Sequence, residues 1–276
     1  MNRRTAVLAL AAALTTVSSS SAAPAAAPAR YTASLTVLES PEHGPQLCVG
    51  VQFSDPPQCT GLDVAGWDWS AVRHEAREGV RWGDYRLVGT WDGARLTITE
   101  PPGEPARHGP MADEDLTPCP EPAGGWPIAD GAKTTWQSAK EAMARAESAG
   151  DFAGAWFDQP PVDGPVSEDT YDPGRAVVNV AFTGGLAGRE EWIREIWGGP
   201  LCLSRAQRTE AELRALQGRV SRDRRAAGDF VGSYTDISGN RVVIMVWVAT
   251  DELRRELDAA YGPGAVELSG ILQPVN

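Results

Sequence analysis

Residues 149–158 read AGDFAGAWFD, and residues 227–236 read AGDFVGSYTD. Six of the ten positions are identical, and Trp156 in the first stretch corresponds to Tyr234 in the second. Such self-similarity indicates an internal repeat, and the alternative is a chance likeness between two ordinary amphipathic segments. The flanking residues favour the repeat, because the secondary-structure signals around the two stretches also follow one order.

A segment of helix-forming composition precedes each stretch, and an apolar run typical of a strand follows it. A helix with apolar spacing comes next and ends at a glycine–proline breaker, and a short strand closes the copy. Thr209, with Glu212 three residues later, is the pattern of a capping box at the start of the second copy. We therefore predict two αββαβ units, residues 131–206 and residues 207–276. Their main signals are the helix 134–149, the strands 176–182 and 242–248, the breakers Gly198-Gly199-Pro200 and Gly262-Pro263-Gly264, and the closing strands 201–204 and 266–272.

Residues 30–102 alternate short β-like runs with turn signals. Asp92-Gly93 lies between two of these runs and predicts a hairpin, because this dipeptide suits a tight turn. Five short strands with little helical periodicity predict a small β-barrel or sandwich. The expected strands are residues 31–38, 47–53, 62–69, 85–91 and 96–99.

Residues 103–130 read as a linker, because prolines and the acidic run Asp113 to Asp115 disfavour regular structure. The predicted fold class is therefore α+β. A small N-terminal β-barrel or sandwich domain is followed by a Pro-rich linker and two tandem αββαβ units.

The first 29 residues predict a secretory signal peptide with a small-residue tail. Arg3 and Arg4 precede an apolar run from Ala6 to Leu14, and alanine-rich cleavage positions follow. We expect cleavage after Ala22, with Ala29 as the second choice. The apolar run is too short to span a bilayer, and no later segment reaches the roughly 20 residues that a membrane helix needs. The predicted location is secreted, either extracellular or in the cell-wall zone.

The net charge disfavours two classes of partner. It is −12 for the whole chain, and removal of Arg3 and Arg4 with the signal peptide changes it to −14. A nucleic acid or an anionic membrane would meet net repulsion. We predict neither partner.

Four cysteines in an exported chain predict two disulfides, with three possible pairings. Cys48 and Cys59 are close in sequence around a Pro-Pro turn, so the simplest pairing joins them and leaves Cys119 to pair with Cys202. A metal site is the alternative, but the spacing contains no C-x-x-C or C-x-x-H knuckle.

The repeated stretch also predicts local packing. We expect Phe152 and Phe230 in equivalent buried positions, with Gly154 and Gly232 where a helix crosses closely. In a regular strand the Phe, the Gly and the Trp or Tyr of each copy would share one face.

AGDFAGAWFD, followed by Val177-Val178-Asn179-Val180, resembles the αββαβ prodomain of streptogrisin and alpha-lytic-type secreted serine proteases. The resemblance covers about residues 152–203 and 230–272. It implies a domain that binds another protein. Two departures are the lack of a following protease domain and Gly198-Gly199-Pro200 in place of the family's Gly-Ala turn. The whole chain, with LCVGVQFSDPPQC, GWDW and TPCPEPAGGW, also resembles uncharacterised exported proteins of actinobacteria, a likeness that implies no function.

The sequence carries none of the common catalytic signatures. The sequence has no G-x-S-x-G, no H-E-x-x-H, no phosphate-binding loop and no calcium loop. The three histidines lie in polar surroundings that favour solvated side chains over ligation or catalysis. Asp63 and Asp68 could serve as the two carboxylates of a glycosidase, but with 37 acidic residues such pairs arise by accident. We assign no catalytic, cofactor-binding or metal-binding residue; the histidines are His43, His74 and His108.

The N-terminal tryptophans have two interpretations. Trp67, Trp69, Trp82 and Trp91 could stack on sugar rings, but core packing is the more frequent use of such side chains. We therefore expect a secreted, non-enzymatic binding or regulatory protein that engages another secreted protein, such as a protease, through the tandem units. The alternative is a carbohydrate- or cell-wall-binding protein, or a hydrolase, that uses the Trp-rich domain.

Overall fold

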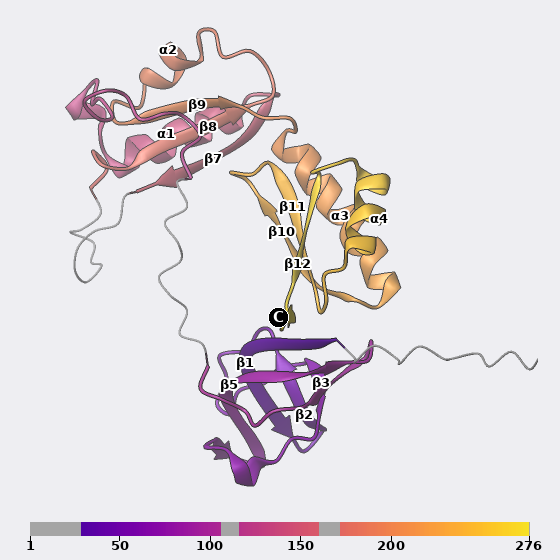
Figure 1. Ribbon diagram of the computed structural model, residues 1–276. Coiled ribbons are helices and arrows are strands. Elements are labelled where there is room, and N and C mark those ends of the chain that lie inside the picture. Colours follow the sequence, from indigo (N-terminus) through magenta and orange to yellow (C-terminus); the bar gives the residue numbers. More distant parts are fainter. Residues whose placement is uncertain (1–28, 106–115, 160–171, 276) are drawn as a thin grey trace, which may run out of the picture.

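The computed structural model describes residues 29–105, 116–159 and 172–275. Figure 1 shows a β-barrel and two small three-stranded sheets with helices, the second sheet lying between the first sheet and the barrel. The predicted α+β class is confirmed. The predicted signal peptide lies outside the described residues, except for Ala29, and so does part of the predicted linker.

Five strands close the N-terminal barrel in the order β1-β2-β3-β6-β5, with β5 pairing back onto β1. All neighbours are antiparallel except β3 and β6, which are parallel. This order corresponds to the Greek-key barrel of the OB type. The strands are β1 (Arg30–Ser40), β2 (His43–Cys48), β3 (Leu62–Ala65), β5 (Val80–Trp91) and β6 (Arg95–Ile98), with the short strand β4 (Glu75–Arg77) added beside β5.

The bounds of the expected barrel strands differ from those observed, and β5 begins at Val80 rather than at residue 85. Only Leu47 and Cys48 of the run expected at 47–53 lie in β2, because the residues after Cys48 belong to a disulfide-closed loop. The run expected at 62–69 ends at Ala65, where Gly66 takes a positive φ of 78° that breaks the strand. Trp69 then opens a short 3₁₀ helix, Trp69–Ala71.

The barrel interior is filled by alternating aliphatic side chains of the strands together with Trp69, which is buried. Trp69 donates its indole N–H to Glu39 at 2.5 Å, and its ring meets the Trp67 ring edge-on at 5.2 Å. Trp67 and Trp91 pack against the same core, and Trp82 packs against a smaller one. The structure therefore uses these four rings mainly for packing.

The two αββαβ units have the same element order and the same sheet order, with the second strand in the middle. In each, the first two strands are antiparallel and the last two are parallel. The first unit contains α1 (Trp136–Glu147), β7 (Phe152–Asp158), β8 (Val177–Phe182), α2 (Arg189–Arg194) and β9 (Leu201–Arg205). The second contains α3 (Glu210–Ala227), β10 (Phe230–Asp236), β11 (Arg241–Val246), α4 (Asp251–Tyr261) and β12 (Val266–Gly270).

The helices of each unit pack on one face of its sheet. Val178, Val180 and Phe182 of β8 meet the buried alanines of α1 and Ile193 of α2. In the second unit, alternate β11 residues meet the leucines of α3 and α4. The predicted capping box of α3 forms, since Thr209 Oγ1 accepts from the Glu212 amide at 3.2 Å. We call the opposite face of each sheet its outer face.

A β-bulge at the start of each repeated stretch determines which side chains reach the outer face. Phe152 pairs with Phe182, but Gly154 pairs with Ala181, so Ala153 is an extra residue. The bulge directs Phe152 to the helix side and Gly154 and Trp156 to the outer face. The prediction that all three share one face is therefore wrong, and the same shift occurs between Phe230 and Gly232.

Contacts at the two phenylalanines and the two glycines also differ from the prediction. Phe152 and Phe230 occupy equivalent positions, but both are half-buried. The atoms nearest to a Cβ added at Gly154 belong to Ile237, in the β10–β11 turn of the second unit, rather than to a helix, and the Cβ would overlap them. At Gly232 a Cβ would meet only the terminal methyl group of Met245, at 2.7 Å.

The second unit is tied to both of its neighbours. Ile237 in its β10–β11 turn lies against Gly154 of the first unit. Asn240 of the same turn accepts hydrogen bonds from the Gln207 and Arg208 amides, at the start of the second unit. At its other end, Leu272 is buried in the barrel core, and the terminal strand β13 (Gln273–Pro274) pairs with β1. The strand expected to run to Leu272 therefore ends at Gly270.

Candidate functional site

Two disulfides form with the predicted pairing, Cys48 to Cys59 and Cys119 to Cys202. The described residues contain no free cysteine. Disulfides persist in oxidising compartments outside the cytoplasm, so the protein is suited to such a compartment. The longer bridge also joins the Pro-rich segment to strand β9.

The outer face of the first unit is occupied by the protein's own residues 116–119. The Trp156 indole N–H donates to the Leu116 carbonyl at 2.9 Å, and Thr117 Oγ1 donates to Asp158 at 2.6 Å. The fully buried Asn179 donates to Thr117 at 3.2 Å. Each of the three strands thus has a contact to this segment, the third through the Cys119–Cys202 bridge.

Among the described residues, no hydrogen bond or disulfide holds such a segment on the equivalent outer face of the second unit, although Val243 at the centre of this face is only 3% exposed. The strand registers match Trp156 to Tyr234, Asn179 to Val243 and Cys202 to Glu267. Tyr234 is 51% exposed, an unusual degree for a large aromatic ring in the middle of a strand. Met245 lies beside Gly232 on the same face and is only partly covered.

An ionic bridge crosses all three strands at one end of this face. Arg241 of β11 bonds Asp236 of β10 at 2.9 Å and Glu267 of β12 at 2.8 Å. Burial acts to raise the pKa of Asp236, but hydrogen bonds from the Gly239 amide, the Ser238 hydroxyl and Arg241 outweigh it and lower the pKa. The carboxylate is therefore charged at neutral pH.

A hollow of about 290 Å³ lies beside β12, the edge strand that ends this sheet. Arg241 and Glu267 line it together with Arg254 and Asp258 of α4. Arg241 and Glu267 belong both to the outer face and to this hollow, so the hollow adjoins the β12 side of that face, whereas Tyr234 lies on β10 at its other edge.

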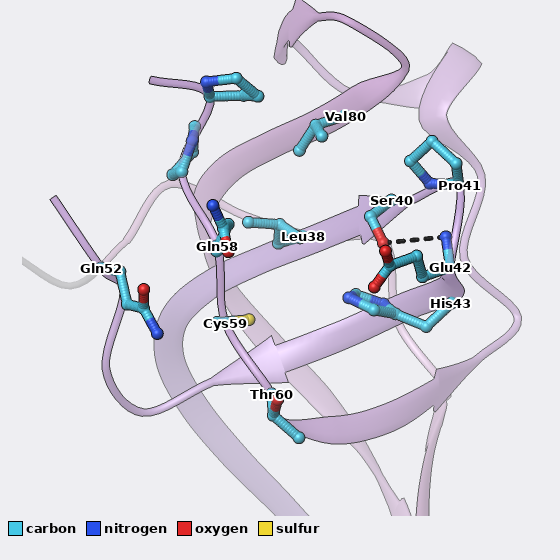
Figure 2. A pocket seen from close by; sticks show the side chains of 12 residues that line it. Leu38, Ser40, Pro41, Glu42, His43, Gln52, Gln58, Cys59, Thr60 and Val80 are labelled. Carbon is cyan, nitrogen blue, oxygen red and sulfur yellow. Dashed lines mark hydrogen bonds between the residues drawn. The ribbon is translucent and has the colours of Figure 1, made fainter. Parts of the chain in front are cut away.

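A second candidate pocket, of about 410 Å³, lies on the barrel. Figure 2 shows it between Glu42 of the β1–β2 turn with His43 at the start of β2 on one side, and Gln52 and Gln58 of the disulfide-closed loop on the other. Its lining is rich in polar side chains and prolines, and none of the ten tryptophans belongs to it. The arrangement offers hydrogen-bonding groups without an aromatic platform.

The other side chains that the sequence singled out have structural contacts. The His74 ring meets Trp69 edge-on at 5.1 Å, and His108 lies outside the described residues. Asp63 accepts from Gln46 at 3.0 Å, and Asp68 caps the 3₁₀ helix by accepting from the Ser70 amide at 2.8 Å. The hydrogen bonds of Asp63 and Asp68 therefore hold the barrel wall.

In the described part of the chain, no three His, Cys, Asp or Glu side chains gather as metal ligands would. No helix within residues 29–105, 116–159 and 172–275 is long and apolar enough to cross a membrane.

The sequence did not predict that residues 116–119 lie on the outer face of the first unit. The signal that could have shown this is the asymmetric cysteine: Cys202 lies in the closing strand of the first unit, where the second unit has Glu267. A cysteine on one sheet face, paired with a cysteine in a Pro-rich segment, indicates that the segment lies on that face. No protein-family model matches the chain, and the curated proteins contain no match to it.

Proposed function

We propose that this is a secreted, non-enzymatic protein that binds an extended segment of another secreted protein, such as a protease, on the outer face of its second αββαβ unit. The observation that carries the proposal is the difference between the two units. One outer face holds residues 116–119 of the same chain, and among the described residues no hydrogen bond or disulfide holds such a segment on the equivalent face of the other.

The first unit supplies an internal precedent for the occupant. Its outer face accepts a segment without regular structure, which includes a proline, through an indole hydrogen bond and side-chain contacts. The second unit keeps the same scaffold and offers Tyr234 and Met245 to a partner. Tyrosine is among the residues that most often dominate protein–protein binding, because its ring buries a large area and its hydroxyl group can still bond.

The edge of the sheet adds a second route for recognition. β12 has a strand partner on one side only among the described residues, so its other side can accept a strand through main-chain hydrogen bonds. Arg254 and Asp258, which line the hollow beside β12, would form ion pairs with charged side chains of that strand. Main-chain bonds would supply affinity, and the hollow would supply selectivity.

Secretion and duplication are parts of this proposal. The N-terminal sequence pattern and the two disulfides support secretion. The shared element order, strand register and bulge position support the descent of both units from one ancestral sequence. The resemblance to protease prodomains is consistent with a protein partner.

Glycan binding by the barrel receives less support, because Trp69 is buried and no tryptophan lines the barrel pocket. A photo-crosslinking residue placed at Tyr234 separates these functions. It should join the protein to one contiguous segment of one secreted protein of the producing bacterium, mapped by mass spectrometry. The same residue at Glu256, exposed on α4, is the matched control.

Affinity for that partner should fall about 30-fold in Tyr234→Ala, the scale of a binding hot spot. Equal crosslinking from both positions, or retention on peptidoglycan without a crosslink from position 234, would contradict the proposal.

A further inference from the structure

The loop between β2 and β3, residues 49–61, displays the most exposed large apolar side chain in the described part of the chain. Phe53 is fully exposed, with a relative accessibility of 111%. Single exposed apolar residues are common on protein surfaces. Phe53 differs in that the loop that carries it is held firmly.

Several contacts constrain this loop. The Cys48–Cys59 disulfide closes it, and the Gln52 amide donates to the Gln58 carbonyl across it at 2.9 Å. Asp55 forms an ion pair with Arg77. A loop that is ordered before binding loses little conformational freedom when a partner binds it. The constrained ring is therefore positioned to enter a pocket of another molecule.

The backbone at the tip is also available. No hydrogen bond among the described residues uses the N–H or the C=O of Phe53, whereas the Ser54 amide donates to the Gln52 carbonyl at 2.8 Å. A projecting side chain with free main-chain groups on the same residue matches the substrate requirement of an endopeptidase. Such an enzyme pairs with the main chain and receives one side chain in its specificity pocket.

Bonds on both sides of the Phe53–Ser54 peptide would hold its two ends together. The Cys48–Cys59 disulfide and the Gln52–Gln58 hydrogen bond span it, and the Ser54 hydroxyl donates to the Pro56 carbonyl at 2.9 Å on the far side. When a serine protease attacks, an ester forms between its serine and the Phe53 carbonyl carbon as the Phe53–Ser54 peptide bond breaks, and the released Ser54 amine must leave before water can hydrolyse the ester. A loop that retains this amine favours religation over release.

We propose that this loop is an inhibitory site for serine proteases whose specificity pocket accepts an aromatic ring, with Phe53 as the residue that enters the pocket. The site lies on the barrel, apart from the outer face of the second unit, and does not depend on the function proposed for that face.

Chymotrypsin is the probe for this proposal, because its specificity pocket is a hydrophobic slot. The intact, disulfide-bonded protein should inhibit chymotrypsin hydrolysis of a chromogenic peptide. Phe53→Ala should weaken inhibition at least about 30-fold, as expected for the central residue of an interface. Phe53→Arg should transfer the inhibition to trypsin, whose pocket holds an aspartate.

Ile128→Ala removes another exposed apolar side chain far from the loop in sequence and serves as the matched control; it should inhibit like the wild type. Peptide mapping of the Cys48–Cys59 bridge verifies that each variant is folded at the loop. The proposal is overturned if the wild type in large excess does not inhibit chymotrypsin, if Phe53→Ala inhibits equally well, or if the Phe53–Ser54 bond is cut as fast as in a linear peptide of the same sequence. None of these results would affect the crosslinking test at Tyr234.

Discussion

The two αββαβ units share a scaffold but differ in what lies on their outer faces. In the first unit, Asn179 and Cys202 hold residues 116–119 of the same chain. In the second, Val243 and Glu267 stand at the equivalent positions, and Glu267 pairs with a neighbouring arginine of its own sheet. The side chains that hold residues 116–119 on the first face, Asn179 and Cys202, therefore have no counterpart on the second face.

Covalent attachment explains why the first face is occupied. A segment joined to its binding surface through the chain, and again through a disulfide, is present at a high effective concentration, so a few hydrogen bonds are enough to hold it. A partner of the second unit would lack this advantage. It would need larger contacts, which the exposed Tyr234 ring and the β12 edge can provide.

The largest expected effect comes from opening the bridge on the first unit. Replacing Cys119 and Cys202 with serine should lower the free energy of unfolding by about 4 to 5 kcal/mol, because the bridge spans 83 positions and restricts the unfolded chain strongly. The same change at Cys48 and Cys59, 11 positions apart, should cost roughly 3 kcal/mol. Chemical unfolding of both variants tests the order, and a larger loss from the short loop would contradict it.

The equivalent aromatic residues Trp156 and Tyr234 should differ in how much they stabilise the fold. Trp156→Ala should cost about 2 to 3 kcal/mol, since it removes a half-buried ring and its bond to the Leu116 carbonyl. Tyr234→Ala should change stability by less than about 1 kcal/mol, because half of that ring is already exposed. Thermal unfolding of the two variants measures the difference. Equal losses would mean that both faces are covered.

Substitutions at Gly154 and Gly232 test whether the second unit packs closely against the first. Gly154→Val should cost about 1 to 3 kcal/mol, because its side chain would overlap Ile237. Gly232→Val should cost less, since it meets only the flexible end of Met245. Combining Gly154→Val with Ile237→Ala should recover part of the loss in a double-mutant cycle. Strictly additive losses would exclude the contact between the units.

The smallest effect concerns the ionic bridge that only the second unit has. Hydrogen bonds that outweigh burial lower the pKa of Asp236 in the folded state. An aspartate in the unfolded chain has a pKa of about 4, so the contribution of Asp236 to stability is complete above about pH 4. This contribution is lost as the pH falls through the lower pKa that Asp236 has in the folded protein. The stability difference between wild type and Asp236→Asn should shrink as the pH is lowered from about 6 to about 3. Urea unfolding across this range measures it, and a constant difference would show that the carboxylate charge is not used.

Local signals predicted much of the fold and little of the candidate site. The αββαβ order, the α3 capping box and both disulfide pairings follow from patterns within short segments or from the small number of cysteines. The bulge at Ala153 could not be predicted, because one extra residue reverses the facing of a strand without changing its composition. The strand expected at 47–53 was wrong after Cys48, where the residues belong to the loop that the correctly predicted Cys48–Cys59 bridge closes.

The sequence by itself determined the kind and order of the elements, since hydrophobic period, caps and breakers act between near neighbours. Only the tertiary structure decided where surfaces are covered. A coil segment such as residues 116–119 has no period that marks the sheet it will contact, and Leu272 looks like the end of a strand until the barrel core receives it. Tertiary contacts between distant segments therefore decide that the first unit's outer face holds residues 116–119.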